Sequence, residues 1–254
     1  MSQNQKFVIA NWKMKLGISE SIHLAKAIKK IKSNVEVVVC PSFASVVEVR
    51  NILKGSKVKV GGQDCFWESE GAYTGEVSAS QLREAGCDYV IIGHSERRKY
   101  LQETDEMIHN KIKTALSASL TPIICVGESF EQRSEGATDY VLINQVTKAI
   151  EGVDLGSDKK IIIAYEPVWV IGSGQAISPD EAEHAHQVIR QSLFDIFSPG
   201  LVKNNFSIIY GGSITSQNVG EFIALENTSG VLVGGASLKS DEFIAIIKNT
   251  QNTY

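Results

Sequence analysis

Eight short apolar runs, most of them rich in β-branched residues, recur from one end of the chain to the other. They lie at residues 7–10, 35–40, 58–60, 89–92, 122–126, 161–165, 206–210 and 230–233. A run that is apolar on both faces is typical of a parallel strand, with helices on one side and a packed interior on the other. Eight such strands are the number that closes into a barrel. The runs therefore predict an α/β fold, a (β/α)8 barrel with parallel strands.

Segments of helical period separate the runs. The first has apolar residues at positions 22, 25, 28 and 31, and another has them at 141, 146 and 150. Helix starts are marked too: Ser178, followed by Pro179 and Glu181, combines an N-cap, a first-turn proline and a capping box. Ser78 and Gln81 have the same spacing. The alternation of strands and helices along the whole chain supports the barrel.

The chain shows no internal boundary. Its 254 residues contain no composition shift, linker or low-complexity tract, so we expect one barrel domain over residues 1–254, although this length would also suit two small domains. An open doubly wound sheet is the structural alternative. It would place a G-x-G-x-x-G fingerprint after the first strand, but Asn11, Trp12 and Lys13 stand there.

Charge and cysteine content exclude several classes of function. Lys and Arg number 25 against 29 Asp and Glu, for a net charge of −4, which predicts no binding to nucleic acid or to an anionic membrane. We find no stretch that could span a bilayer and no signal-peptide segment at the start. The four cysteines form no C-x-x-C pair, so a zinc site or a disulfide framework is not expected. Reduced thiols and a cytoplasmic location fit best.

Polar residues and glycines follow the ends of most of the apolar runs. They include Asn11, Lys13, Gln63, Asp64, His94, Glu128, Glu166, Ser213, Gly234 and Gly235. In a parallel barrel the carboxyl ends of all strands meet on one face, where active sites are built. We therefore expect the functional site among these residues.

Six stretches follow one another at barrel spacing: NWKM at 11–14, GAYTGEVS at 71–78, IIGHSERR at 91–98, AYEPVWVIGSGQ at 164–175, YGGS at 210–213 and VGGASL at 233–238. With all of them in this order, the chain closely resembles the triosephosphate isomerases over essentially its whole length. The resemblance implies an aldose–ketose isomerase of glycolysis and gluconeogenesis, acting on dihydroxyacetone phosphate and D-glyceraldehyde 3-phosphate through an enediolate. It implies no metal and no cofactor.

The same resemblance assigns the catalytic roles. Glu166 is the base, and Pro167 after it keeps its backbone extended. His94 precedes a helix, whose amino end disfavours an imidazolium, so we expect a neutral ring that polarises the substrate carbonyl. Lys13 supplies a flexible positive charge for the phosphate and the developing oxyanion, and Asn11 donates to the same oxygens. Glu96 is expected to hold Lys13.

Phosphate binding is expected to depend mainly on backbone amides. The substrate-binding set is Asn11, Lys13, Gly172, Ser213, Gly234 and Gly235. The last two glycines are expected to open a short helical turn whose dipole favours an anion, and they allow the backbone to approach the phosphate closely. Residues 167–176 are expected to form a lid, with Ile171 and Leu232 shielding the base from water.

Several other residues are assigned supporting positions. We expect Cys125 to lie buried under Glu166, Gln63 and Glu128 to support the site, and Trp169 to anchor the lid. Four positions depart from the commonest family pattern: Lys15, Val170, Ser173 and Gln175. None is a matched catalytic residue, so they concern lid kinetics. His23, His109, His184 and His186 fall in helical segments, and we expect them on the surface.

The stretch at 71–78 carries Tyr73 and Thr74 at its tip and is too exposed for a monomer. By resemblance it inserts into a second subunit, where Thr74 supports Asn11 and His94, and Glu76 pairs with Arg97. A homodimer through loop 71–78 is therefore expected.

Two other functions remain open at this point. The first is another phosphate-binding barrel enzyme, such as an aldolase or a synthase. A Schiff-base aldolase would need a lysine on a strand, for which only Lys59 is available. A non-catalytic barrel would be favoured by loss of Glu166, His94 or Lys13, and all three are present.

Overall fold

The computed structural model of the chain describes residues 5–156 and 158–253, and its eight strands close into a parallel barrel in sequence order, with β1 paired to both β2 and β8. The strands are β1 Phe7–Asn11, β2 Glu36–Cys40, β3 Lys59–Gly62, β4 Tyr89–Ile92, β5 Thr121–Val126, β6 Ile161–Tyr165, β7 Phe206–Tyr210 and β8 Gly230–Val233. The predicted barrel is confirmed, and each of the eight apolar runs overlaps one strand.

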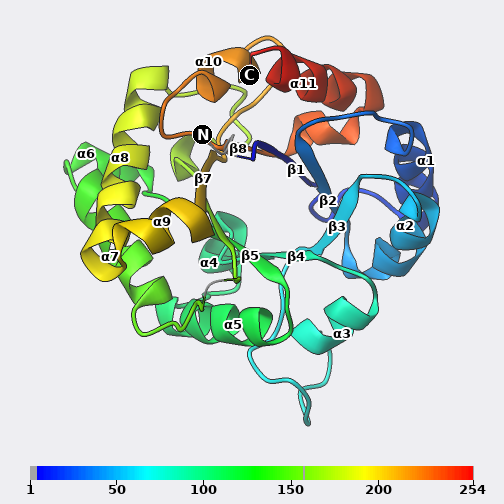
Figure 1. Cartoon of the computed structure of the whole chain (residues 1–254), viewed down its shortest axis with the longest axis horizontal. Helices are drawn as coiled ribbons and strands as arrows, with labels where there is room; N and C mark the ends of the chain where they lie inside the picture. Colours follow the sequence, from blue (N-terminus) through cyan, green and yellow to red (C-terminus); the bar gives the residue numbers. More distant parts are fainter. Residues whose placement is uncertain (1–4, 157, 254) are drawn as a thin grey trace.

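The helices form a ring outside the strands (Figure 1). They are α1 Ile18–Ile28, α2 Val46–Leu53, α3 Ala79–Glu84, α4 Ser95–Tyr100, α5 Asp105–Ser117, α6 Phe130–Ser134, α7 Thr138–Ile150, α8 Pro179–Ile196, α9 Pro199–Asn205, α10 Val219–Ile223 and α11 Ser240–Asn252. Three 3-10 turns, η1 Phe43–Ser45, η2 Val168–Val170 and η3 Gly235–Leu238, add to them. The predicted caps are present: Ser78 Oγ accepts from the amide of Gln81, and Ser178 Oγ from that of Glu181.

The strands bury both of their faces, as their sequence requires. One set of residues fills the barrel interior, including Ile9, Val38, Ile91, Ile123, Ile162, Ile209 and Leu232. The alternate positions of the same strands, such as Val8, Val39, Ile92 and Ile163, pack outward against the helices. Because each strand separates two apolar layers, it reads as a continuous apolar run.

The loop between β3 and α3 extends beyond the ring of helices (Figure 1). Its residues 70–76 are all exposed, and the Tyr73 side chain is 45% exposed. Within the described residues, no helix combines the length and the apolar character needed to cross a membrane.

The expectation that His186 lies on the surface is wrong. His186 is fully buried on the inner face of α8, four residues after the buried Ala182, so helical spacing turns it towards the barrel. Its Nδ1 lies 2.8 Å from Thr228 Oγ1, and its ring meets the Tyr165 ring edge-on. Burial lowers the pKa of His186 to about 3, and Arg190 adds to the effect. The ring is therefore neutral.

Of the other histidines, His23 and His184 are exposed, as expected. His109 is partly buried, with its Nδ1 3.1 Å from the carbonyl oxygen of Ala149.

Candidate active site

A cavity of about 290 Å³ opens at the carboxyl ends of the strands. It is lined by every residue of the predicted site, namely Asn11, Lys13, His94, Glu166, Gly172, Ser213, Gly234 and Gly235. Ile171 and Leu232, the two apolar residues expected to shield the base, line it as well. Residues from β1, β4, β6, β7 and β8 thus meet at one place, because parallel strands bring all their carboxyl ends to the same face.

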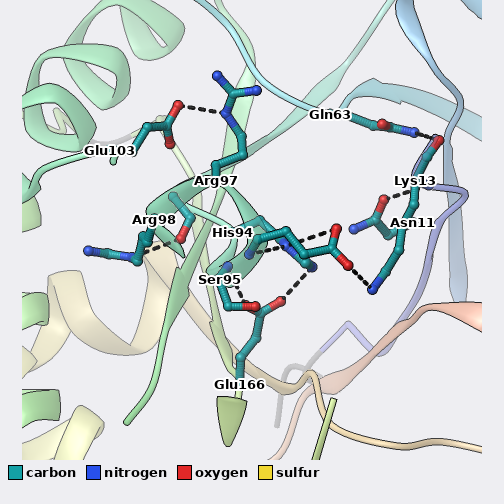
Figure 2. A network of polar contacts seen from close by, with 11 residues as sticks. Asn11, Lys13, Gln63, His94, Ser95, Arg97, Arg98, Glu103 and Glu166 are labelled. Atoms are coloured by element: carbon teal, nitrogen blue, oxygen red, sulfur yellow. Dashed lines mark hydrogen bonds and ion pairs between the residues drawn. The ribbon is translucent and has the colours of Figure 1, made fainter. Parts of the chain in front are cut away.

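Glu166 follows β6 directly and is almost completely buried, with 2% of its surface exposed. Its Oε2 accepts a hydrogen bond from the backbone amide of Ser95 at 3.0 Å, and its Oε1 lies 3.1 Å from His94 Nε2 (Figure 2). Its own amide donates to the carbonyl of Val126 at 2.7 Å. The carboxylate is therefore held by two donors at the floor of the cavity.

Two glycines enclose Glu166 tightly. A Cβ on Gly127 would lie 1.7 Å from the carbonyl oxygen of Glu166, a distance that no side chain can occupy. A Cβ on Gly211 would lie 3.0 Å from Glu166 Cγ. These glycines allow neighbouring strands to approach the base closely. Sequence reasoning did not identify them, although each lies just beyond the end of its strand.

His94 is the N-cap residue of α4. Its Nδ1 accepts a hydrogen bond from the backbone amide of Glu96 at 3.2 Å. A ring nitrogen that accepts a hydrogen bond carries no proton, so the proton of the neutral ring is on Nε2. That Nε2–H points at Glu166 and is available as a donor in the cavity. The geometry matches the expected neutral imidazole.

Lys13 is held in an uncommon backbone conformation. Its φ of +53° lies in the left-handed region, which costs a non-glycine residue of order 1–3 kcal/mol. Three contacts maintain it. The Lys13 amide donates to Asn11 Oδ1 at 3.0 Å, Gln63 Nε2 donates to the Lys13 carbonyl at 2.8 Å, and Lys13 Nζ pairs with Glu96 Oε1 at 2.6 Å. The expected contact with Glu96 is confirmed, and Gln63 supports the site as predicted.

A buried charge cluster lies behind α4. Arg97 Nε donates to Glu103 at 2.6 Å, and its Nη2 pairs with Asp64 at 2.7 Å. Lys111, only 2% exposed, reaches Asp64 at 2.7 Å and also pairs with Glu103. Burial raises the pKa of Asp64 to about 6, against the opposing charge of Lys111. The cluster ties the start of α4, with His94 and Ser95, to β3 and α5.

Asp64 was expected at a strand end, whereas no role was predicted for Glu103 or Lys111. A signal was available for Lys111. Lys111 lies on the apolar face of its helix, with Ile108, Ile112 and Ala115. A charged residue on such a face requires a buried partner.

Residues 167–176, the segment expected to form a lid, are anchored by a tryptophan near their start. Trp169 Nε1 donates to Glu128 Oε1 at 3.0 Å, and the Arg133 guanidinium lies 4.5 Å from the centre of the Trp169 ring. Glu128 is fully buried and also accepts from the Tyr165 hydroxyl at 3.2 Å. Burial raises the pKa of Glu128, although these hydrogen bonds oppose the rise. Trp169 is an anchor, as predicted, and Glu128 is its acceptor.

The tip of the lid is built by glycines and one serine. Gly172 and Gly174 have φ angles of +77° and +79°, which favour glycine. Ser173 Oγ donates to the Val170 carbonyl at 2.8 Å and accepts from the Gln175 amide at 3.1 Å. Of the residues that depart from the family pattern, Val170 is buried and Gln175 is exposed.

Cys125 is fully buried inside the barrel, in the layer below Glu166. Burial raises the pKa of its thiol, and the Glu166 carboxylate raises it further. The expected position of Cys125 under the base is confirmed, and the thiol stays protonated.

Lys59, the lysine that a Schiff-base aldolase would need, is the first residue of β3. It therefore lies at the amino end of the barrel, where its Nζ is 3.5 Å from Asp88. Because the cavity is at the carboxyl ends, this lysine is at the wrong end of the strand for Schiff-base chemistry. Among residues 5–156 and 158–253, no group of three or more His, Cys, Asp or Glu side chains is placed to hold a metal ion.

Comparison with known proteins is consistent with this geometry. The family model for triosephosphate isomerase matches residues 6–250. The chain is 42% identical to the triosephosphate isomerase of Dictyoglomus turgidum over 248 residues, covering 96% of this chain and 99% of that protein. It is 44% identical to the triosephosphate isomerase of Geotalea uraniireducens over 248 residues, covering 96% and 98%.

A solved structure agrees with these sequence matches. The triosephosphate isomerase of Bartonella henselae superposes with a TM-score of 0.85 at 34% identity, covering 96% of this chain and 98% of that one. The chain therefore belongs to the triosephosphate isomerase family, glycolytic aldose–ketose isomerases that interconvert dihydroxyacetone phosphate and D-glyceraldehyde 3-phosphate.

Proposed function

We propose that Glu166 catalyses this isomerisation by removing a proton from one carbon of the substrate and returning it to the adjacent carbon. The proposal is supported by the position of Glu166, which is 2% exposed and lines a cavity together with Lys13 and His94. A carbon next to a carbonyl is a weak acid, so the base must be positioned closely and shielded from water. Ile171 and Leu232 line the cavity and supply that shielding.

His94, Asn11 and Lys13 stabilise the enediolate oxygens. The Nε2–H of His94 acts as a neutral donor, since its Nδ1 is occupied as an acceptor. A neutral imidazole donates a hydrogen bond to the developing oxyanion without adding a charge of its own, and His94 presents this Nε2–H from the start of α4. Lys13 contributes a positive charge, which is worth most where the oxyanion develops. The proton that Glu166 accepts is the proton that it returns, so the reaction requires no redox cofactor and no metal.

The phosphate group binds at Gly172, Ser213, Gly234 and Gly235. Gly235 begins η3, where backbone amides have no partner within the turn and favour an anion. A Cβ on Gly235 would meet nothing within 4 Å, so the backbone there faces open space in the cavity. Phosphate binding then supplies the energy that closes lid 167–176 over the base.

The chain acts as a homodimer through loop 71–78, in the cytoplasm. The loop is exposed along most of its length, and Tyr73 presents an aromatic ring to solvent. From the partner subunit, Thr74 would support Asn11 and His94, and Glu76 would approach Arg97. The four cysteines are buried free thiols, as is usual in a reducing compartment. We also propose that residues 1–254 form one domain.

Replacement of Glu166 by Gln tests the base directly. Turnover in a coupled assay of glyceraldehyde 3-phosphate should fall by about 10²–10⁴-fold or more, because the amide cannot accept the proton. Glu48→Gln, at an exposed position of α2, is the matched control and should leave turnover unchanged. Full activity in a folded Glu166→Gln variant would refute the role. No activity in the folded parent chain would instead favour a non-catalytic barrel.

Lys13→Ala separates binding from catalysis. Because the lysine charge serves both the bound substrate and the transition state, kcat and KM should both deteriorate. A change in KM alone would remove the role of Lys13 in stabilising the oxyanion. Sedimentation tests the dimer, since a fully active monomer would contradict it.

A further inference from the structure

A second cavity, of about 450 Å³, lies at the amino ends of the strands. It is therefore at the opposite end of the barrel from the active site. Its lining includes the first residues of several strands, among them Phe7 of β1, Tyr89 of β4 and Phe206 of β7. The strands between the two ends span roughly 15 Å at about 3.3 Å per residue. A molecule bound at the amino ends would therefore not overlap the substrate.

The charged residues that line this cavity are mostly positive. Lys160, Arg190 and Lys203 contribute three cations, against the single carboxylate of Glu36. The Oε1 of Glu36 accepts a hydrogen bond from the Tyr89 hydroxyl at 3.2 Å. Lys203 takes part in no ion pair within the part of the chain that the structure describes. The cavity therefore has an excess of positive charge in a mainly polar lining, of which Phe7 and Phe206 form part of the apolar share.

Arg190 is the most buried of these cations, and its guanidinium is poorly satisfied. Its Nε is buried without a hydrogen-bond partner among the described residues, and its Nη2 makes only a long contact, 3.4 Å, with the carbonyl of Asn227. The nearby Glu183 is engaged elsewhere, since both its carboxylate oxygens accept from Asn227. Burial lowers the pKa of Arg190, although the charges of Glu183 and Glu226 oppose this. A partly buried guanidinium without a carboxylate partner is costly unless an anion neutralises it.

The elements that carry these cations are neighbours in the fold. Arg190 is on α8, Lys203 is on α9, and these helices pack against each other beside β7 (Figure 1). Lys160 immediately precedes β6, and its Nζ donates to the carbonyl of Asn204 at the end of α9. The positive groups thus come from three segments that line the same cavity, and Phe206 lines it as well.

We propose that the cavity at the amino ends of the strands binds a small organic anion. Its carboxylate or phosphate group pairs with Arg190 and Lys203, and its apolar body lies against Phe7 and Phe206. A volume of about 450 Å³ is sufficient for a ligand of this kind. The site is separate from the isomerase site, and its existence does not depend on the catalytic roles proposed above.

Amide chemical shifts of the full-length protein, titrated with benzoate and in parallel with phenyl phosphate, test the proposal. Benzoate carries the carboxylate form of the ligand and phenyl phosphate the phosphate form. Saturable shifts are expected at Phe7, Ser207 and Ser229, which line the cavity. The amide of Gly235 reports on the isomerase site, so that phosphate binding there is recognised separately. Isomerase activity should be unaffected by saturating benzoate.

Three variants measure the contribution of charge. Arg190→Gln should weaken benzoate binding about tenfold or more, because a charge-assisted hydrogen bond is lost. Lys203→Gln, at an exposed position where the fold is not at risk, should weaken it about two- to fivefold. Lys113→Gln, exposed on α5 away from the cavity, is the matched control and should bind like the parent.

The proposal is overturned if neither ligand produces saturable shifts at Phe7, Ser207 and Ser229. It is equally overturned if shifts appear only around Gly235, or if the affinity of Lys203→Gln equals that of the Lys113→Gln control. Should Arg190→Gln fail to fold, the comparison between Lys203→Gln and Lys113→Gln decides the outcome alone.

Discussion

Replacing Gly211 with alanine perturbs the position of the base without changing any charged or polar group of the site. The added Cβ would lie 3.0 Å from Glu166 Cγ and 3.2 Å from the carbonyl oxygen of Tyr165. That carbonyl cannot withdraw, because it accepts the Gly211 amide at 2.8 Å at the edge of the β6–β7 pairing. The Glu166 side chain must therefore move away from Gly211.

The size of the effect follows from the geometry. Ordinary contacts of a Cβ begin at 3.4 Å, so Glu166 has to move by a few tenths of an ångström, against its hydrogen bonds to Ser95 and His94. A misplacement of about 1 Å can cost about 10²-fold in rate. We therefore expect Gly211→Ala to lower kcat by about tenfold, with a smaller change in KM, because the phosphate contacts are untouched.

Steady-state kinetics with thermal unfolding on the same samples provide the measurement. Gly200→Ala is the matched control, since a Cβ there, on α9, meets nothing within 4 Å; its kinetics should equal those of the parent. If folded Gly211→Ala retains the parental kcat, the catalytic rate does not depend on this position of Glu166. If only KM changes, the residue influences binding and the reasoning about the base is wrong.

Three further predictions concern stability and the lid. Burial of neutral His186, whose pKa is lowered from 6.5 to about 3, stabilises the fold above the unfolded pKa, and this contribution is lost as pH falls towards 3. In urea unfolding, the free energy of unfolding should fall by about 3 kcal/mol from this source between about pH 7 and about pH 4, and His186→Gln should lack this loss. Parallel losses in both proteins would contradict burial of a neutral ring. Lys111→Met should lower the free energy of unfolding by about 3–5 kcal/mol in urea, because Asp64 and Glu103 would keep buried charge without their lysine. Adding Asp64→Asn should recover part of this loss. A change in the free energy of unfolding below about 0.5 kcal/mol would mean that the cluster does not support the fold. Deleting residues 171–174 should slow isomerisation and raise the methylglyoxal formed per turnover, because an enediolate exposed to water can expel its phosphate; product analysis showing no such rise would restrict the lid to binding.

The conformation of Lys13 links the fold to the proposed chemistry. A φ of +53° is unfavourable for lysine, yet Asn11, Gln63 and Glu96 all hold the residue in place. Two of these residues come from other strands or helices, so the cost is met by tertiary contacts. The result is a Lys13 that lines the cavity in a position set before substrate arrives, as the proposed oxyanion role would require.

The strands could be predicted from the sequence because a strand buried on both faces needs apolar residues at almost every position, which produces a continuous apolar run. The runs at 89–92, 161–165, 206–210 and 230–233 coincide with β4, β6, β7 and β8. The third run was displaced: it was expected at 58–60, whereas β3 covers Lys59–Gly62. Gly61 and Gly62 have no apolar side chain to extend the pattern. Gly61 is required by its neighbours, since a Cβ there would lie 2.8 Å from Cys40 Sγ.

The site residues that the sequence alone determined are those next to strand ends and inside contiguous motifs. Asn11, Lys13, His94 and Glu166 were all named, because a parallel barrel brings the carboxyl ends of its strands together regardless of detail. Their convergence on one cavity is confirmed. The specific roles of these residues in catalysis remain predictions.

Only the tertiary structure decided which residues surround and orient those groups. The Ser95 amide reaches Glu166 across 71 positions of the chain, and Lys111 reaches Asp64 across 47. For His186, the spacing from Ala182 and Ile189 already places the ring on the apolar face of α8, and the tertiary structure adds only its partners, Tyr165 and Thr228. Periodicity reports how a residue relates to its neighbours within one element. Contacts between elements depend on strand register and helix packing, which local sequence does not encode. The partners that hold the site residues, such as the Ser95 amide and Lys111, could therefore be identified only from the tertiary structure.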